Sequence, residues 1–532
     1  MILIIHQDAK KLVRVKYKGK ELKVEEIILC RVFLKLAEEY PDEIIAWCEK
    51  EFEGDLNLDY WNQVFHHDLI MASYALKTVY LTDAIGYIDQ LPFVNVNREV
   101  QYATWRMSTD VGGIKGKVLL QFQKMFGQIS DFGFLLNSVA KLGQQNGLFC
   151  YSVPNLIKPQ LQQSFSEKEL KAQAGNRELF FFVKAHYKNI RLWLLFWFFV
   201  RYEKLFPVGA LIRAVFQEKY FKRNIDLSVI ELRSNKAGNT GTSIDVIIPT
   251  LGRKQYILQV LEDLKAQTLL PKKVIIVEQD PDSGSQSELP ELQTQSWPFE
   301  IVHHFTHKTG ACQARNLALN EVDAAWVFFN DDDNRIEKDV LKNALQEINR
   351  IGADLLTLKY SQKGEKHIFG KIKQWGTLGA GNSIIAGKFT SKIRFDMAYE
   401  YGYAEDKDYG MQLRNAGCDI IYHPNLEILH LKAPRGGFRK IKATPWGKDK
   451  PKPSPTLMVY AKTYYSPQQL KGFKAELFLR YYSKQEVKNP LKYFKMMRQR
   501  WCKSEEWAER LMGNRKEKIE SRAKNEESRF SL

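Results

Sequence analysis

Short apolar runs, each followed by polar residues, recur along the second half of the chain. Four of them have the length and the β-branched or aromatic content of strands: 244–248, 274–277, 299–303 and 326–329. We expect the first strand to end at Pro249, and residues 312–320 to form a short helix. Apolar positions also recur at helical spacing at Ile257, Leu258, Leu261 and Leu264. Strands that alternate with helices predict an α/β fold with a mostly parallel sheet and right-handed crossovers.

The run 326–329 is the most informative, because three consecutive aspartates, Asp331, Asp332 and Asp333, follow it. Ligands of open α/β sheets lie at the carboxyl ends of the strands, where three adjacent carboxylates are costly unless a cation offsets them. Oxygen ligands suit Mg²⁺ or Mn²⁺, which would in turn hold a diphosphate. A solvated acidic turn is the alternative for the three aspartates taken alone.

The longest apolar run, 192–200, lies between Arg191 and Arg201 and is well short of the roughly 20 residues that span a bilayer. We expect a buried helix here. Because Trp193 and Trp197 have Lys204 and Arg213 nearby, a segment lying on a membrane surface is the alternative.

The 532 residues carry a net charge of +17, which favours anionic partners. No nucleic-acid-binding signature is present, so a membrane surface or phosphorylated ligands are expected rather than nucleic acid. The six cysteines show no metal-binding spacing, as in a reduced cytosolic protein, and the N-terminus has no signal-peptide pattern. We therefore expect a cytoplasmic protein, with peripheral attachment to the inner face of the cell membrane as an option.

Composition also divides the chain. A polar, glycine-containing stretch at 235–243 is expected to be a linker, and the sequence KPKPSP at 450–455 breaks regular structure before a basic, helical end. The prediction is three parts: a first domain over 1–235, a catalytic domain over 243–450 and a helical basic extension over 451–532.

Four further motifs accompany the aspartates in order: IPTLGR at 248–253, VEQD at 277–280, HKTG at 307–310 leading into ARN at 314–316, and YAEDKD at 403–408 before LRNAG at 413–417. Together they resemble glycosyltransferase family 2, the inverting GT-A enzymes, over roughly residues 243–440. The resemblance implies a GT-A sheet flanked by helices and a metal-dependent transfer from a nucleotide sugar, with UDP the expected nucleotide.

The resemblance also implies site residues. Asp331 and Asp333 match the metal-binding ends of the DxD pattern, and Asp332 would lie near the ribose or donor sugar. The expected nucleotide contacts are Pro249, Thr250, Arg253, Arg315 and Glu278, which stands where the family usually has Asp. A salt bridge to an aspartate is the structural alternative for Arg315.

On the acceptor side, Asp406 matches the catalytic base and Glu405 lies beside it, although paired carboxylates also suit an ordinary helix N-terminus. His430 falls where some members supply a third metal ligand, and a core histidine is its alternative. The basic loop 432–440 is a lid or a solvated connection. Trp375, Gly381 and Asn382 belong to the acceptor side or to the core.

The first half echoes the second. Phe132-Gly133-Phe134 precedes Pro154-Asn155-Leu156 much as Tyr401-Gly402-Tyr403 precedes Pro424-Asn425-Leu426, and Trp105, Ile114 and Trp47 are matched with Trp375, Ile384 and Trp326. At the place of Glu405 and Asp406 the first copy has Leu135 and Leu136. We expect a degenerate GT-A-like domain that does not catalyse, with chance similarity as the alternative.

The predicted function is metal-dependent transfer of a sugar to a hydroxyl of a glycan or lipid-linked saccharide in the cell envelope. Two alternatives stay open. One is a sugar nucleotidyltransferase, whose usual glycine-rich phosphate loop is not found at 249–253. The other is a non-catalytic saccharide- or membrane-binding protein that retains the fold.

Overall fold

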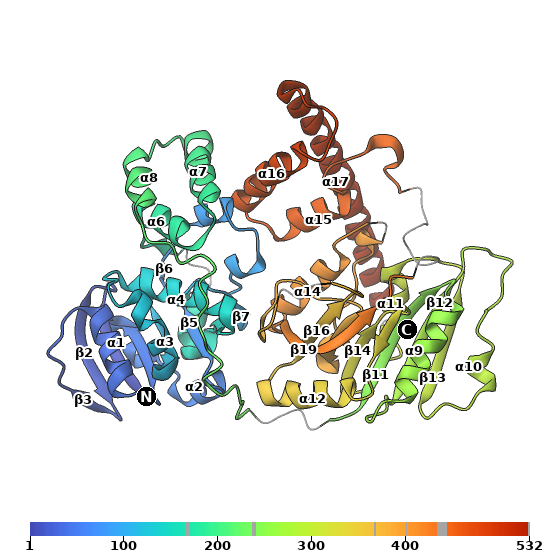
Figure 1. The fold of residues 1–532 in the computed structure, drawn as a ribbon, viewed down its shortest axis with the longest axis horizontal. Helices are drawn as coiled ribbons and strands as arrows, with labels where there is room; N and C mark the ends of the chain where they lie inside the picture. The colour runs from blue at the N-terminus through green and yellow to red at the C-terminus, as the bar shows by residue number, and fades with distance from the viewer. Residues whose placement is uncertain (166–169, 237–240, 366–368, 401, 434–443, 530–532) are drawn as a thin grey trace.

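The computed structural model describes residues 1–165, 170–236, 241–365, 369–400, 402–433 and 444–529, with side chains omitted at 163–165 and beyond 513. Two mixed sheets, each flanked by helices, lie side by side, and three C-terminal helices rise above them (Figure 1). The latter are α15 (Pro455–Tyr464), α16 (Pro467–Tyr482) and α17 (Pro490–Arg529). Of the linker, residues 237–240 lie outside the described residues.

The second sheet has the strand order β13-β12-β11-β14-β18-β16-β19-β15, with β17 also paired to β19. Its first four strands are parallel and include all four predicted ones, whereas β18 is antiparallel to β14 and β16. The strands are β11 (Ile244–Leu251), β12 (Lys273–Gln279), β13 (Glu300–Thr306), β14 (Trp326–Asn330), β15 (Asn334–Ile336), β16 (Leu355–Ser361), β17 (Lys373–Gln374), β18 (Asn382–Ala386) and β19 (Ile421–His430).

Strand β11 does not end at Pro249, contrary to expectation, but continues to Leu251. It pairs with β12 over its length from Asp245, whereas its ladder with β14 stops at Ile247. Proline lacks an N–H and is tolerated where one side of a strand has no ladder to donate to. The extension carries Thr250 to the carboxyl edge of the sheet.

Alternate residues of β11 enter two cores. Val246 and Ile248 pack in the same core as α9 (Lys254–Lys265) and α12 (Val340–Ile351). Ile247 belongs to a second core with α11 (Ala311–Leu319) and α14 (Glu405–Asn415). The sheet is therefore covered on both faces, which leaves its carboxyl edge for function. Two short helices, α10 (Glu291–Thr294) and α13 (Gly387–Thr390), complete this half.

The first sheet has the order β3-β2-β1-β4-β8-β5-β9-β7. From β1 to β7 its order and strand directions match β11-β14-β18-β16-β19-β17, while an antiparallel hairpin stands in place of β12 and β13. The strands are β1 (Ile2–Gln7), β2 (Lys11–Tyr17), β3 (Lys20–Leu22), β4 (Ile44–Glu49), β5 (Ile70–Tyr74), β7 (Tyr102–Ala103), β8 (Val111–Lys115) and β9 (Phe149–Ser152). The helices are α1 (Leu29–Glu39), α2 (Leu58–Val64), α3 (Gly116–Phe126), α4 (Phe132–Asn146) and α5 (Pro159–Phe165), and β6 (Thr78–Val79) pairs with β10 (Lys171–Ala172) apart from the sheet.

Ladder register aligns the two sheets residue by residue. Tyr151 pairs with Ala72 and Ala103 in the first sheet, and Ile421 pairs with Leu356 and Gln374 in the second. Tyr151 therefore corresponds to Ile421, and Pro154 corresponds to Pro424, as predicted. Three of the predicted matches are wrong in this register. Trp375 aligns with Thr104, Ile114 with Ile385, and Trp47 with Phe329. Bulky side chains fill neighbouring core positions in the two halves, so residue identity misled the alignment. Tyr401 lies outside the described residues.

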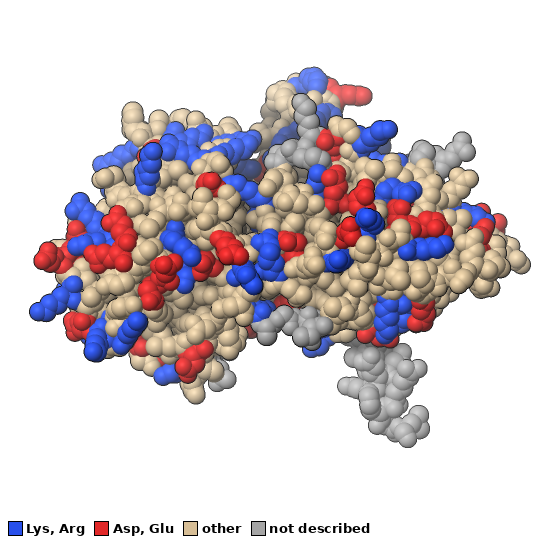
Figure 2. Space-filling model, turned by 60° about the horizontal axis from the view of Figure 1, so that its bottom comes forward, with Lys and Arg blue, Asp and Glu red and all other residues tan. Residues whose placement is uncertain are grey.

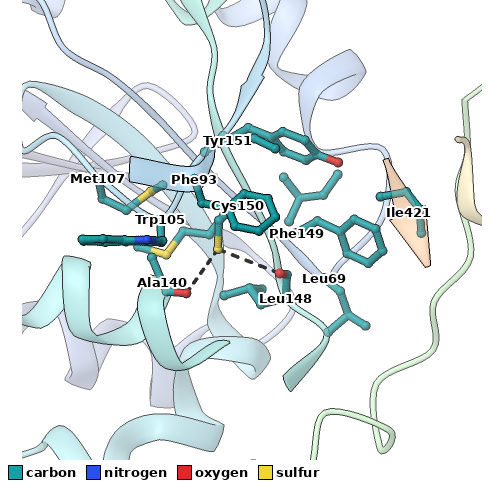
Figure 3. Packing of buried hydrophobic residues seen from close by; sticks show 14 of the residues in the cluster. Leu69, Phe93, Trp105, Met107, Ala140, Leu148, Phe149, Cys150, Tyr151 and Ile421 are labelled. Atoms are coloured by element: carbon teal, nitrogen blue, oxygen red, sulfur yellow. Dashed lines mark hydrogen bonds between the residues drawn. The ribbon is translucent and has the colours of Figure 1, made fainter. Parts of the chain in front are cut away.

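The two sheets meet at β9 and β19. Figure 3 shows Phe149 and Tyr151 facing Ile421 across this junction. The buried Gln374 side chain also bridges it, because its Oε1 accepts from Gln144 Nε2 at 2.8 Å and from the Cys150 amide at 2.9 Å. Since both hydrogen bonds are buried, separating the halves would leave polar groups unsatisfied.

Contrary to expectation, the apolar run 192–200 is not a buried helix. It is a helix with one exposed face. It forms α7 (Asn189–Phe198) and a π-helical turn, η5 (Phe199–Glu203). Together with α6 (Asn176–His186) and α8 (Val208–Val215) it forms a small helical unit at the edge of the first domain (Figure 1). No described helix is long and apolar enough to cross a membrane.

Candidate active site

A cleft of about 760 Å³ opens at the carboxyl ends of β11 and β14. Most of the predicted site residues line it, together with residues from the start of α11, from α14 and from the C-terminal segment. The predicted residues that line the cleft are Pro249, Arg253, Arg315, Asp331, Asp332, Asp333, Glu405 and His430. Side chains more than 150 positions apart in the sequence thus share one space because their strands and helices end at one edge of the sheet.

Asp331 faces Arg315, as the structural alternative for that arginine predicted. The Arg315 guanidinium is buried and its Nη2 lies 3.2 Å from Asp331 Oδ1. Burial works to lower the pKa of Arg315, but the charges of Asp331, Asp406 and Glu405 outweigh it and raise that pKa. The buried Arg315 cation therefore interacts both with Asp331 and with the pair Glu405 and Asp406.

Asp332 lines the cleft with a buried carboxylate that two side chains engage. Its carboxylate accepts from Thr250 Oγ1 at 2.8 Å and from Arg253 Nη1 at 2.6 Å. Burial raises the pKa of Asp332 to about 6, and the Arg253 charge limits that rise. Thr250 and Arg253, expected to contact a nucleotide, thus also fix the middle aspartate.

Asp333 meets His430. Its Oδ1 lies 3.3 Å from His430 Nε2, and its Oδ2 accepts from the Ala433 amide at 2.9 Å and lies 3.3 Å from Arg253 Nη1. Burial would raise the pKa of Asp333, but the His430 contact, the Ala433 amide and Arg253 together lower it. This carboxylate is therefore kept ionised, as a metal or cation site needs.

Tyr360 links the outer two aspartates and was missed by sequence reasoning. Its ring stacks on His430 with centroids 4.6 Å apart, and its hydroxyl donates to Asp331 Oδ2 at 3.0 Å. Nothing in the chain near Tyr360 resembles a motif, since it lies on β16, whose pairing with β19 brings it to the site.

The metal-ligand set is incomplete by protein atoms alone. Among the described residues, no group of three or more His, Cys, Asp or Glu is placed to hold a metal ion. Mg²⁺ commonly takes one or two carboxylates and completes its shell with water and substrate phosphates. Asp331 and Asp333 line one cleft and fit that pattern, with His430 beside Asp333.

Glu405 and Asp406 open helix α14. The residue before them, Ala404, has a φ of 89°, a left-handed conformation that is costly for a residue with a Cβ and often marks functional sites. Burial and the neighbouring Glu405 charge raise the pKa of Asp406 to about 7, with Arg315 acting in the opposite direction. Glu405 lines the cleft, whereas Asp406 is half-buried and is not among the lining residues.

Glu278 does not line the cleft. At the end of β12 it accepts from Ser287 Oγ at 2.5 Å and from the Glu288 amide at 2.9 Å, and it lies 2.9 Å from His303 Nε2. Burial would raise its pKa, but these three partners lower it. Its carboxylate stabilises the loop after β12, so a contact with a base requires that loop to exchange partners.

Two glycines bring backbone close to acidic side chains. A Cβ on Gly381 would lie 2.1 Å from Asp331 Oδ2, and one on Gly310 would lie 2.1 Å from the Glu400 carboxylate. Glu400, also missed by sequence reasoning, lines the cleft and accepts from the Gln313 amide at 2.8 Å at the start of α11. A Cβ at either position would therefore displace the facing carboxylate.

The remaining predicted acceptor-side residues lie elsewhere. Trp375 stacks on Tyr422 with centroids 4.8 Å apart, and Asn382 Nδ2 donates to the Leu358 carbonyl. Neither lines the cleft: Asn382 is buried, and Trp375 is partly buried against the second core. Of the basic loop 432–440, residues 434–440 lie outside the described residues.

One family model matches part of the second half of the chain. Residues 245–392 match the family model "Glycosyl transferase family 2". The poly(ribitol-phosphate) beta-N-acetylglucosaminyltransferase TarS of Staphylococcus aureus is 29% identical over 115 residues, which are 21% of this chain and 20% of TarS. The glycosyltransferase GlyA of Streptococcus pneumoniae is 22% identical over 232 residues, which are 38% of this chain and 32% of GlyA.

Among solved structures, residues 1–349 of S. aureus TarS in complex with UDP-GlcNAc give a TM-score of 0.35 at 19% identity, over 45% of this chain and 73% of that one. This chain thus spans a fifth of TarS and about a third of GlyA.

Proposed function

Because residues 245–392 form a glycosyltransferase family 2 domain, we propose that this chain is an inverting glycosyltransferase that uses a nucleotide-sugar donor. One observation carries the proposal. Asp331 and Asp333, the proposed metal ligands, line the same cleft as Glu405, which precedes the proposed base Asp406, and the buried Arg315 lines it too.

On the donor side, Asp331 and Asp333 would bind a divalent cation, Mn²⁺ or Mg²⁺, with His430 as a further ligand. Such a cation offsets the negative charge that develops on a departing diphosphate. The chain's own residues prepare the place: Arg253 holds Asp332 and Asp333, and Arg315 holds Asp331. UDP is the nucleotide we propose.

On the acceptor side, Asp406 is proposed as the general base and Glu405 as the group that orients the acceptor. A base must be ionised at working pH and still hold a proton well, and a pKa of about 7 satisfies both needs. The Arg315 charge limits the rise in the pKa of Asp406.

The acceptor is proposed to be a hydroxyl of a glycan or lipid-linked saccharide of the cell envelope. TarS, whose name gives poly(ribitol-phosphate) as its acceptor, is among the relatives that match part of this chain. The positive net charge of +17 also suits an acceptor that carries phosphate.

The first domain is proposed to be a non-catalytic copy of the same fold. It repeats the order and directions of six strands. Leu135 and Leu136 of α4, both buried, stand where Glu405 and Asp406 stand. A cavity of about 820 Å³ between this domain, α14 and α15 offers Asn95, Asn97 and Tyr464 to a longer acceptor.

The deciding experiment is a transfer assay with purified protein, a panel of nucleotide sugars, and metal added or withheld. The proposal expects metal-dependent release of a nucleoside diphosphate with one donor. Release of pyrophosphate would favour a nucleotidyltransferase, and saccharide binding without turnover of any donor would favour a non-catalytic binding protein.

A further inference from the structure

An apolar surface lies on helices α7 and α8 and the turn between them. Its members are large side chains with at least two fifths of their area exposed: Ile190, Trp193, Trp197, Leu205, Phe206, Val208, Ile212, Val215 and Phe216. We call this set the hairpin patch. Phe206 is 72% exposed and Phe216 is 84% exposed, which is unusual for an aromatic residue in a water-soluble fold.

Helical periodicity shows that the exposure is systematic. On α7 the inward positions Leu192 and Leu195 are buried against the core of the first domain, and Trp193 and Trp197 lie on the other face. On α8, Leu211 and Ala214 are buried, whereas Val208, Ile212 and Val215 are exposed. Helices that are apolar on both faces ordinarily have a second apolar neighbour.

Cations surround the patch. Between residues 188 and 223 the chain carries eight Lys or Arg and only two acidic residues, Glu203 and Glu218. Arg201, Lys204 and Arg213 are exposed among the apolar residues. On the face drawn in Figure 2, Lys and Arg side chains gather along the upper left edge. An apolar surface rimmed by cations is complementary to anionic lipid headgroups above acyl chains.

We propose that the hairpin patch docks the protein on an anionic lipid bilayer, lying in the headgroup region without spanning it. Tryptophan favours this depth, because its ring is apolar and its N–H is polar. The turn between the helices carries Leu205 and Phe206 outward, where they reach the acyl boundary first.

A second copy of the chain fits the patch less well than a bilayer does. A two-fold dimer places the same surface on both sides of the interface. Arg201, Lys204 and Arg213 of one copy would then face the same three cations of the other. Like charges across an interface are unfavourable, whereas anionic lipid supplies the opposite charge.

The C-terminal helices extend the same side. Figure 1 shows α16 and α17 rising on the side where α7 and α8 lie, and Arg191 Nη2 joins the two groups through Glu476 of α16 at 2.7 Å. Leu479, Leu491 and Phe494 of these helices are also exposed. Docking through the hairpin patch therefore brings the C-terminal helices toward the lipid as well.

The test is co-sedimentation of the full-length protein with vesicles of phosphatidylcholine alone or mixed with phosphatidylglycerol. We expect binding to the mixed vesicles that weakens as salt is raised. The variant Phe206→Ser/Phe216→Ser should reduce binding by about tenfold or more, since two rings lose their burial in lipid. Lys204→Glu/Arg213→Glu should reduce binding only to the vesicles that contain phosphatidylglycerol.

Matched controls use exposed residues outside the patch. Ile27, 75% exposed, and Val229, 67% exposed, become serine in one variant, and Lys10 and Lys20 become glutamate in another. These controls should bind like the unchanged protein. Equal binding by the patch variants and their controls, or a patch variant that changes the oligomeric state measured by light scattering while vesicle binding stays the same, would overturn the proposal.

Discussion

His430 Nε2 lies 3.3 Å from Asp333 Oδ1, at the end of a chain of contacts that crosses the cleft. The His430 ring stacks on Tyr360, and the Tyr360 hydroxyl donates to Asp331. The two outer aspartates are therefore coupled through one aromatic pair, although neither His430 nor Tyr360 is near them in the sequence. This coupling makes the geometry of the pair sensitive to changes on β16 and β19.

Asp333→Ala is expected to weaken metal-dependent binding of a nucleotide donor by at least about tenfold, because a carboxylate ligand of the cation is lost. His430→Gln should have a smaller effect in the same direction. Titration calorimetry with UDP, with Mn²⁺ present and absent, measures both. Asp282→Ala, an exposed aspartate in the loop after β12, is the control. Unchanged affinity in Asp333→Ala would contradict the metal assignment.

Asp406→Asn is expected to leave donor affinity nearly intact and to lower kcat by about a hundredfold or more, since general-base catalysis contributes on that order. Glu405→Gln should retain measurable turnover with a raised KM for acceptor. Steady-state kinetics on the two variants distinguishes the roles. If Glu405→Gln lost turnover and Asp406→Asn kept it, the residue that lines the cleft would be the base.

The pH dependence of turnover follows from the Asp406 pKa of about 7. A base must be deprotonated, so kcat should fall as the pH drops below about 7, whereas an unperturbed aspartate would hold activity to about pH 4. After burial, the negative charge of Glu405 is the main cause that raises the pKa of Asp406. In Glu405→Gln the acid limb should therefore move to lower pH, and a limb that does not move would exclude this coupling.

Gly381→Ala is expected to displace the Asp331 side chain, because the added Cβ would lie 2.1 Å from its Oδ2. Because the Asp331 carboxylate can swing aside, the stability cost should be below the roughly 1–3 kcal/mol of a crowded core, whereas the Arg315 and Tyr360 contacts of Asp331 should weaken. Thermal unfolding and donor binding together report the change. Gly370→Ala, where a Cβ meets nothing within 4 Å, is the matched control. Equal donor binding by the two variants would contradict this account.

Much of the second half was accessible from the sequence. Strand-like runs and helical periodicity depend on local side-chain patterns, so the four strands and α9 were predicted close to their observed bounds. A family motif set also located the aspartates, Arg315 and the pair that begins α14. The parts that were predicted incorrectly, such as the end of β11 at Pro249, depend on which neighbour a strand lacks.

The sequence by itself determined which charged residues lie at the ends of strands, because the type of each side chain and its distance along the chain from a strand are properties of the sequence. Only the tertiary structure decided which of those charges meet. Arg253 reaches across to Asp332, Glu278 is engaged by its own loop, and Tyr360 joins the site from β16. Long-range pairing of strands sets such contacts, and no local pattern encodes it.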